Sequence, residues 1–439
     1  MQRSKTRLGG AGLALVLFAP AAFAQTQVLD AAEPVSITST TPAVIDTVSV
    51  DVVGTRDVGL AAHLYVEGTN FNGNGYEFRL ERVTPSASVV GTATWAPAAA
   101  LNASVAGDTI AITGFDEAVA TPAVYRLVGQ KISAAAANLT VTARGIDAIQ
   151  RNAGSIVAGS RAAASVAVNA STLTPIHTLD VSVPFPGDVL LWGHVTLSKP
   201  SGGDDGAYGV GICDQAGASL AVDIWLPGAH TPETNVVSVV ALDTDVPDDT
   251  SYSICASKVG NAPVATATFR SLQAVRALAL EGSAGGPGAA AAVASTAYGA
   301  IWILDVANTD PEGMAILLQT SLVTTGLANH LYEFGIHRGS CAGTRIGAAK
   351  WRPGAGPVDP DVSDTLLVTG FDPSPGEPQS YAFCGRKTNA AAPDLQFYTI
   401  RMAAAPLPVP EPGAAMAAIT SGVALVAMAR SRRRLGSSP

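Results

Sequence analysis

The chain has few charges and none of the short motifs that mark common enzyme classes. Charged residues make up 14% of its 439 residues, which argues against a strongly charged, disordered chain. Its six histidines are scattered, and none stands in an H-E-x-x-H spacing. The sequence also has no G-x-S-x-G elbow and no phosphate-binding P-loop. We therefore predict no catalytic residues.

Cysteines are also few, and acidic residues outnumber basic ones. Four cysteines would form two disulfides in an oxidising compartment, which the end segments described below predict. Seven of the 26 basic residues and one of the 35 acidic residues lie in the two end segments described below. The body between them therefore has a formal charge of −15. Such an acidic body is a poor ligand for nucleic acid.

The first residues have the organisation of a secretory signal peptide. Arg3, Lys5 and Arg7 form a basic region, and the apolar run 8–19 that follows is too short to span a membrane. Ala22-Phe-Ala24 is an A-x-A cleavage site. We predict that residues 1–24 are removed and that the mature protein begins at Gln25.

The last residues form a second targeting segment. Residues 413–429 are uncharged and mostly apolar. This stretch of 17 residues is near the lower limit of length for a membrane-spanning helix. A proline-rich strip precedes them, and an arginine cluster that stays on the cytoplasmic side follows them. The strip is Val409, Pro410, Glu411 and Pro412, and the cluster is Arg430, Arg432, Arg433 and Arg434.

This order of Pro-Glu-Pro, apolar helix and arginine cluster over 408–434 resembles the PEP-CTERM sorting signal. The resemblance implies an exosortase-type processing enzyme as partner, in a Gram-negative bacterium that produces exopolysaccharide. It also implies transient residence in the inner membrane, removal of the tail, and a cell-surface or extracellular location. A plain C-terminal membrane anchor is the alternative, but it has no need of the Pro-Glu-Pro strip.

The body contains an internal repeat. Tyr76-Glu-Phe recurs as Tyr332-Glu-Phe, and every matched pair up to Leu139 and Leu395 is separated by 256 positions. A more divergent copy lies between the two. The matched framework residues are Trp95, Trp225 and Trp351; Asp116, Asp243 and Asp372; and Tyr125, Tyr252 and Tyr381. Each copy also closes on a segment that ends in arginine, at Arg144, Arg270 and Arg401.

Alternation of apolar and polar residues within each copy predicts strands, and no long helical period competes outside the end segments. We predict three tandem β-sandwich units at 33–146, 172–280 and 298–404. Small-residue stretches at 147–171 and 281–297 are predicted to be flexible linkers. The step from Asp116 to Tyr125 resembles the tyrosine corner of immunoglobulin-like and fibronectin type III sandwiches. That resemblance implies an immunoglobulin-like fold, with the Tyr hydroxyl bonded to nearby backbone.

The repeat also predicts the disulfide pairing. Cys255 and Cys384 each lie three residues beyond the corner tyrosine, and Cys213 and Cys341 each follow the other framework tyrosine. Both pairs therefore join the same two regions of their own unit, so we predict Cys213–Cys255 and Cys341–Cys384. The first copy has Val128 at the matching position and no cysteine, which fits bonds within units.

Asp-rich loops are the only metal candidates. They are Asp204 and Asp205; Asp243, Asp245, Asp248 and Asp249; and Asp359, Asp361 and Asp364. Calcium favours clustered carboxylates, but none of these loops has the EF-hand order, and we favour solvated turns. No cofactor is therefore predicted.

These observations favour a non-catalytic structural or adhesive protein of the cell surface or of an exopolysaccharide matrix. Two alternatives stay open. One is a carbohydrate-binding protein, in which the repeated tryptophans would stack on sugars. The other is an extracellular hydrolase with a site between units, which would need two carboxylates at catalytic distance.

Overall fold

The computed structural model describes strands and turns, and no helix, over most of the body of the chain. The described residues are 23–28, 34–50, 55–97, 105–119, 122–150, 156–182, 186–200, 206–227, 233–247, 249–277, 281–285, 292–307, 313–325, 330–353, 361–376 and 379–406. None of them forms a helix long and apolar enough to cross a membrane. The sorting strip, the arginine cluster and the predicted C-terminal helix lie outside these residues, as does Ala22, so they stay predictions. Ala24 and Gln25 lie in the first strand.

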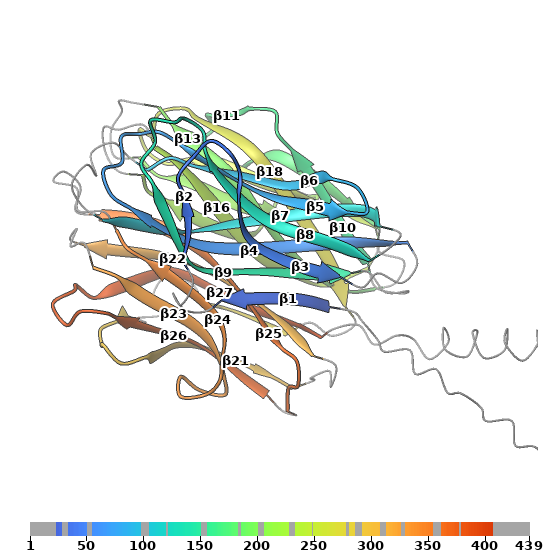
Figure 1. Cartoon of the computed structure of the whole chain (residues 1–439). Helices are drawn as coiled ribbons and strands as arrows, with labels where there is room; N and C mark the ends of the chain where they lie inside the picture. Colours follow the sequence, from blue (N-terminus) through green and yellow to red (C-terminus); the bar gives the residue numbers. More distant parts are fainter. Residues whose placement is uncertain are drawn as a thin grey trace, which may run out of the picture.

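The strands form three β-sandwiches in succession (Figure 1). Unit 1 contains β1 (Phe23–Val28), β2 (Val35–Ile37), β3 (Ala43–Val50), β4 (Arg56–Gly68), β5 (Tyr76–Thr84), β6 (Ser88–Trp95), β7 (Ala106–Val119), β8 (Ala123–Lys131) and β9 (Leu139–Gln150). Unit 2 contains β10 (Ile156–Ala162), β11 (Val166–Val168), β12 (Thr174–Val181), β13 (Gly187–Lys199), β14 (Tyr208–Cys213), β15 (Ser219–Trp225), β16 (Glu233–Val246), β17 (Thr250–Lys258) and β18 (Ala265–Ala277). Unit 3 contains β19 (Glu281–Gly285), β20 (Ala292–Val293), β21 (Gly299–Val306), β22 (Met314–Thr325), β23 (Tyr332–Arg338), β24 (Arg345–Trp351), β25 (Asp361–Asp372), β26 (Gln379–Lys387) and β27 (Leu395–Pro406).

Each unit has the strand order of a jelly roll, so the predicted immunoglobulin-like order is wrong. In unit 1 one sheet has the order β1-β9-β4-β7, with β2 also paired to β9, and the other has β3-β8-β5-β6. Units 2 and 3 repeat both orders. First strands thus pair with last ones and middle strands with each other, as in one long hairpin wound into a sandwich. Alternation in the sequence predicts strands but does not determine which strands pair.

The two small-residue stretches are not simple linkers, which corrects a second prediction. The stretch 147–171 contains the end of β9 and all of β10 and β11, and 281–297 contains β19 and β20. β10 and β11 both pair with β18, and β19 and β20 both pair with β27. Small residues there form the edge strand that opens each new sandwich, because the last strand of the same unit supplies its backbone hydrogen bonds.

The framework aromatic residues occupy equivalent core positions, as predicted. Trp95, Trp225 and Trp351 are buried, and each ring lies against Tyr76, Tyr208 or Tyr332 at centroid distances of 5.8, 5.5 and 5.9 Å. The hydroxyls of these three tyrosines each donate to a backbone carbonyl oxygen at 2.8 Å. A buried, repeated tryptophan is a packing residue, so these tryptophans are not the sugar-stacking platform of the carbohydrate alternative.

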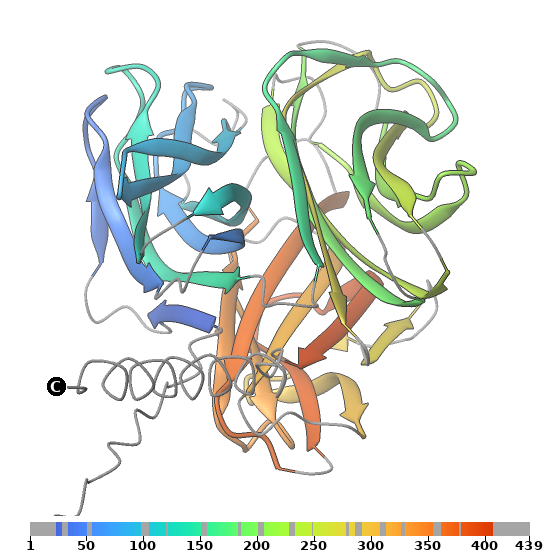
Figure 2. The same ribbon diagram turned by 90° about the vertical axis from the view of Figure 1, so that its right-hand side faces the viewer.

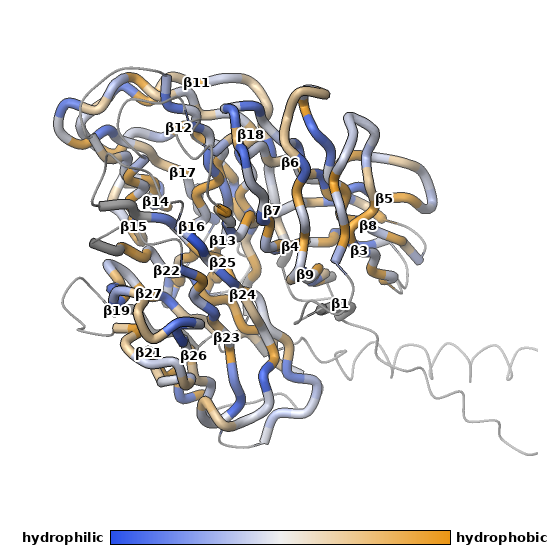
Figure 3. Tube along the Cα trace, turned by 60° about the vertical axis from the view of Figure 1, so that its left-hand side comes forward, coloured by the Kyte–Doolittle hydropathy of each residue, from blue (hydrophilic) through white to orange (hydrophobic). Residues whose placement is uncertain are grey.

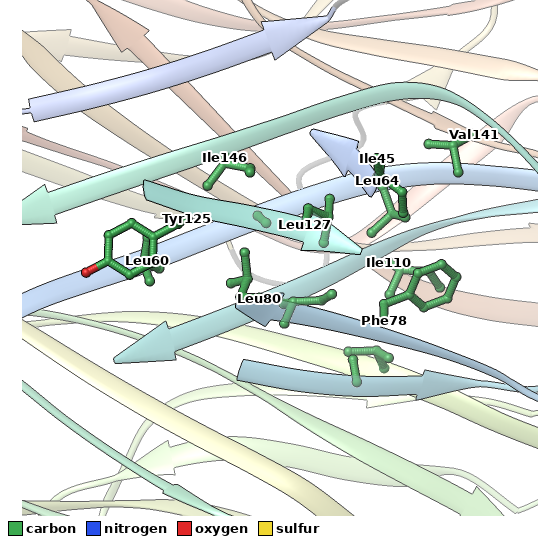
Figure 4. Close-up of a cluster of buried hydrophobic side chains, with 14 of the residues drawn as sticks. Ile45, Leu60, Leu64, Phe78, Leu80, Ile110, Tyr125, Leu127, Val141 and Ile146 are labelled. Atoms are coloured by element: carbon green, nitrogen blue, oxygen red, sulfur yellow. The ribbon is translucent and has the colours of Figure 1, made fainter. Parts of the chain in front are cut away.

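The second set of tyrosines has a different partner from the one that the tyrosine corner implies. Tyr125, Tyr252 and Tyr381 donate to the carboxylates of Asp116, Asp243 and Asp372, at 2.8, 2.7 and 3.1 Å. Figure 4 shows Tyr125 with Leu60 and Leu127 in the core of unit 1. The nine-residue step in the sequence is therefore a side-chain contact between the ends of two strands. It replaces the backbone bond that the resemblance implied.

Two disulfides are present, and both have the predicted partners. Cys213 is bonded to Cys255 and Cys341 to Cys384. Cys213 in β14 and Cys255 in β17 join two neighbouring strands of one sheet. Cys384 lies in β26, the equivalent of β17, whereas Cys341 lies in the turn that follows β23, the equivalent of β14. In the chain-entropy model a loop of this length stabilises its unit by roughly 4 kcal/mol.

Each unit has its own hydrophobic core between its two sheets. A fourth buried cluster lies where the three units meet. Figure 2 shows the three sandwiches arranged around a common centre. The strands in the middle of the molecule, such as β16 and β22, carry hydrophilic as well as hydrophobic segments (Figure 3). All buried members of the fourth cluster come from one sheet of each unit, which we call the inner sheet. The inner sheets have the orders β1-β9-β4-β7, β10-β18-β13-β16 and β19-β27-β22-β25.

Candidate functional site at the junction of the three units

The inner sheets bury a small apolar cluster and a larger set of polar side chains against one another. Trp192, Leu190 and Leu317 are among the apolar members. Buried polar groups are stable only when they are hydrogen-bonded, so their partners define how the units are joined. Three such connections, one at each junction, use equivalent positions of the repeat.

His194 of unit 2 connects that unit to unit 1. Its side chain is fully buried, and Nε2 donates to the Thr92 carbonyl oxygen at 2.9 Å. Nδ1 accepts from the Thr113 backbone N–H at 3.0 Å and lies 2.9 Å from the Thr113 hydroxyl. These partners require the neutral ring with its proton on Nε2. Burial lowers the pKa of His194 to about 4, against a partial opposing effect of the Thr92 hydrogen bond.

His63 connects unit 1 to unit 3 in the same way. Its Nδ1 lies 3.1 Å from the Thr369 hydroxyl, and the ring hydrogen-bonds the backbone of Ala348. Thr369 and Ala348 are the repeat equivalents of Thr113 and Thr92, each 256 positions later. Burial lowers the pKa of His63 to about 4 as well. Two junctions are therefore made by one histidine geometry.

The third junction replaces histidine by glutamine and arginine. Gln319 of unit 3 stands 256 positions after His63, and its Oε1 accepts from Arg401 at 3.1 Å. Arg401 also donates to the Val222 carbonyl oxygen of unit 2 at 3.1 Å. Val222 is the unit 2 equivalent of Thr92, because both lie three residues before the framework tryptophan. The contacts therefore run from unit 1 to 3, 3 to 2 and 2 to 1, and they close a ring with approximate threefold symmetry.

Asp223 adds a buried carboxylate to this third junction. Its Oδ1 accepts from Thr399 at 2.6 Å and from the Ser321 hydroxyl, both of unit 3. Its Oδ2 lies 3.7 Å from the Arg401 guanidinium. Burial raises the pKa of Asp223 to about 7, although Arg401 and the Thr399 hydrogen bond both oppose that rise. Its equivalents in the other units are Ala93 and Ala349, so this carboxylate is specific to the third junction.

Backbone bridges and three axial side chains complete the ring. Ala96 pairs with Thr234 across units 1 and 2, and Arg352 pairs with Gly107 across units 3 and 1. Next to the bridged residues Thr234 and Gly107 lie Asn235 and Asp108, and the corresponding residue of unit 3 is Asp364. All three side chains are buried, with exposed fractions of 5% for Asp108, 4% for Asn235 and 6% for Asp364.

A cleft of about 310 Å³ opens between units 1 and 2 beside His194. Unit 1 contributes residues of β6 around Thr92, and unit 2 contributes Arg161, Phe269 and Arg270. Phe269 is the extra residue of a β-bulge, at a positive φ of 39° that is uncommon for a bulky side chain. The residues that line the cleft include two arginines and no carboxylate.

Where the structure describes the candidate loop carboxylates, they do not come together as metal centres. Within the described part of the chain, no group of three or more His, Cys, Asp or Glu side chains could hold a metal ion. Asp243 instead accepts from Tyr252, and Asp249 accepts from Ser182 at 3.0 Å. Asp204, Asp205, Asp248 and Asp359 lie outside the described residues. Asp364, predicted as a loop residue, is a buried strand residue at the junction.

Sequence reasoning missed the junction residues, although one indication was present. Asp57-Val58 and Asp188-Val189 each precede a histidine by six positions, so His63 and His194 are matched members of the repeat. The histidine does not recur in all three copies, because the third copy has Gln319 at this position, and the six histidines therefore look scattered. Arg401 was matched to Arg144 and Arg270, but its neighbour on the adjacent strand is Gln319, whereas theirs are Leu64 and Val195. A shift of one residue places its side chain on the opposite face of the sheet.

No protein-family model matches the chain, and no curated protein matches it. Among solved structures, N-glycanase F (PNGase F) has a TM-score of 0.31 at 7% identity, over 58% of this chain and 96% of that one. The VP2 subviral particle of infectious bursal disease virus has a TM-score of 0.22 at 7% identity, over 94% of this chain and 87% of that one. The insecticidal δ-endotoxin Cry8Ea1 of Bacillus thuringiensis has a TM-score of 0.20 at 8% identity, over 75% and 52%. None of these likenesses is close enough to assign a family or an activity.

Proposed function

We propose that the chain is an exported, non-catalytic structural or adhesive protein of the cell surface or exopolysaccharide matrix, sorted by an exosortase-type enzyme. The N-terminal A-x-A site and the Pro-Glu-Pro tail support export and processing. The observation that carries the non-catalytic part is the use of the buried polar groups. His63, His194 and Asp223 each have partners on the neighbouring unit, so their polar atoms join units and are not directed at a substrate.

Two further features support a surface location. Both disulfides lie within single units, and such bonds persist in oxidising compartments. The ring of three sandwiches is closed by contacts within one chain. Both properties suit a protein that must remain folded outside the cell.

The sorting proposal is tested by fractionating the producing cells and measuring the intact mass of the protein in each fraction. We expect a secreted or surface form that begins at Gln25 and lacks Arg432–Arg434. Replacing Glu411 by Gln should lead to retention of the uncleaved form in the membrane fraction. An extracellular protein that still contains the arginine cluster would contradict sorting by tail removal.

A second candidate function is binding of a carbohydrate in the cleft between units 1 and 2. Phe269 and Arg161 line this cleft, and a half-buried aromatic ring beside a cation suits an acidic sugar. Isothermal titration with oligouronates should then show binding that Arg161→Gln weakens and that Arg56→Gln, on unit 1 and outside this cleft, does not. Titration with no heat at millimolar sugar would exclude it.

The hydrolase alternative has less support. Glycoside hydrolysis needs two carboxylates that flank a substrate, and the residues lining the cleft include none. Asp108 and Asp364 do lie together, but both are buried at the junction of the units. A screen for release of reducing sugar from the producing strain's exopolysaccharide tests this alternative directly.

A further inference from the structure

The three axial side chains, Asp108, Asn235 and Asp364, occupy one position of the repeat. Each is the cross-strand neighbour of an equivalent residue, namely Val66, Leu197 and Leu322. Asn235 and Asp364 each accept a hydrogen bond from the backbone N–H of the next residue, both at 2.7 Å, and Asp108 bonds the backbone of Thr109. The ring therefore brings two carboxyl groups and one amide together, away from water.

The hydrogen-bond donors around the two carboxyl groups are unequal. Asp364 accepts from Asn235 Nδ2 at 3.0 Å, from Trp351 Nε1 at 3.0 Å and from its neighbouring backbone. Asp108 Oδ1 is buried and has no donor among the described residues. The Asp108 side chain is nevertheless hydrogen-bonded to that of Asp364. A contact between two carboxyl groups needs a proton, and the three donors stabilise the charged form at Asp364.

The charged groups that face this pair do not neutralise it. Glu233 of β16 adds a negative charge near Asp108, and the Tyr65 hydroxyl of β4 is a further neighbour. The nearby cations form ion pairs elsewhere: Arg352 with Glu67 at 3.9 Å, and Lys350 with Glu333 at 3.6 Å. Within the described residues, neither Asp108 nor Asp364 has a cationic partner, so a second buried negative charge would be strongly unfavourable.

The arrangement fits a proton better than a metal ion. The Asn235 oxygen accepts from the Val236 N–H, which turns the amide NH2 toward Asp364. The Trp351 N–H points at the same carboxylate. N–H donors repel a cation and stabilise an anion that also accepts from a carboxylic acid. Asn235 of unit 2 occupies the remaining axial position, so the site does not contain a third buried carboxylate.

We propose that Asp108 and Asp364 form a proton-binding site at the centre of the ring, in which a proton held by Asp108 joins unit 1 to unit 3. Burial, followed by the charge of Asp364, raises the pKa of Asp108 well above its usual range. A group with a raised folded-state pKa stabilises the fold fully below its ordinary pKa, and that contribution is lost as pH rises through the raised value. Alkaline pH therefore weakens this junction. The inference concerns the assembly of the ring and does not depend on the proposed function.

Two matched variants of the full mature chain test where the proton lies. Asp108→Asn keeps a donor toward Asp364 and needs no proton, so its junction should no longer weaken with alkaline pH. Asp364→Asn turns an amide N–H toward the donors Asn235 or Trp351, so it should unfold more readily at every pH. Relative to Asp108→Asn, the unfolding constant of the wild type should rise about tenfold per pH unit up to the pKa of Asp108. A ratio that does not change with pH, or two variants that behave alike, would overturn the proposal.

An infrared measurement gives an answer even if Asp364→Asn fails to fold. At neutral pH the wild type should show a stronger carbonyl stretch of protonated carboxylic acid than Asp108→Asn, because Asp223, with a pKa of about 7, contributes equally to both spectra and only the wild type has a proton on Asp108. Asp305→Asn, altered at an exposed position, should retain the full wild-type band. A band at neutral pH that is as strong in Asp108→Asn as in the wild type would contradict a proton on Asp108.

Discussion

The junctions made by His63 and His194 differ in chemistry from the junction made by Arg401 and Asp223, although all three use equivalent strands. The two histidine rings are neutral and hydrogen-bond only to threonine and backbone. The third contains a buried ion pair, two hydroxyl donors and a glutamine. A repeat can thus keep the position of a contact while its three copies fill that position with unrelated groups.

The difference gives the histidine contacts and the Asp223 contact opposite responses to pH. The histidines have pKa values lowered from 6.5 to about 4, so their contribution is present above 6.5 and is lost as pH falls through about 4. Asp223 has its pKa raised from 3.8 to about 7, so its contribution is present below 3.8 and is lost as pH rises through about 7. Acid therefore weakens the histidine contacts, and mild alkali weakens the Asp223 contact.

The largest expected effect comes from removing the carboxylate of the third junction. Asp223→Ala leaves Arg401 without its buried partner and the Thr399 and Ser321 hydroxyls without an acceptor. We expect a loss of about 3–5 kcal/mol in unfolding free energy, measured by chemical denaturation. Asp305→Ala is the matched control, because Asp305 accepts from the Ser380 hydroxyl at an exposed position and should cost under about 0.5 kcal/mol. Equal losses of unfolding free energy in the two variants would show that the buried carboxylate contributes no more stability than an exposed one.

Acid should weaken only the histidine junctions. Between pH 6.5 and about 4 each histidine should lose about 3 kcal/mol of its contribution, because each imidazolium would oppose a donor in a site without water. The double variant His63→Gln with His194→Gln places glutamine at both positions, as unit 3 does with Gln319. Its stability profile should lack this acid slope. A double variant as acid-sensitive as the wild type would place the sensitivity elsewhere.

A single histidine separates the loss of packing from the loss of hydrogen bonds. His194→Ala leaves the Thr92 oxygen and the Thr113 N–H unpaired beside a cavity, and should cost about 2–4 kcal/mol at neutral pH. His194→Gln retains a donor and an acceptor, so its cost should be nearer about 1 kcal/mol. Thermal and denaturant unfolding both measure the difference. Similar costs would mean that volume alone matters at this position.

The smallest effect is a predicted gain at the third junction. Gln319 Nε2 is buried and has no hydrogen-bond partner among the described residues, and Val240 of unit 2 stands where units 1 and 3 have Thr113 and Thr369. Val240→Thr would supply the missing hydroxyl acceptor and should stabilise the protein by up to about 1 kcal/mol. Val240→Ala, which offers no hydroxyl, should instead destabilise it. A Thr variant no more stable than the Ala variant would show that the two side chains do not meet.

The repeat in the sequence predicts the units, the aromatic framework and both disulfides, because each of these contacts lies within one unit. Tyr125 and Asp116, nine residues apart, recur together and so could be recognised. The strand order could not be predicted, since alternation identifies a buried face and not the neighbouring strand. The contacts between units could not be predicted either, because their members are far apart in the sequence and form no short, repeated motif. His63 and Thr369, for example, are 306 positions apart.

The ring nitrogens of His63 and His194 test the central claim most directly. Nitrogen-15 NMR of histidine-labelled protein, assigned with the single His→Gln variants, reports the tautomer and the protonation of each ring. For His194 we expect a neutral ring with the proton on Nε2, and for both rings a titration near pH 4. Titration of both near the ordinary value of 6.5 would show that these rings contact water and that the three units are not joined as described.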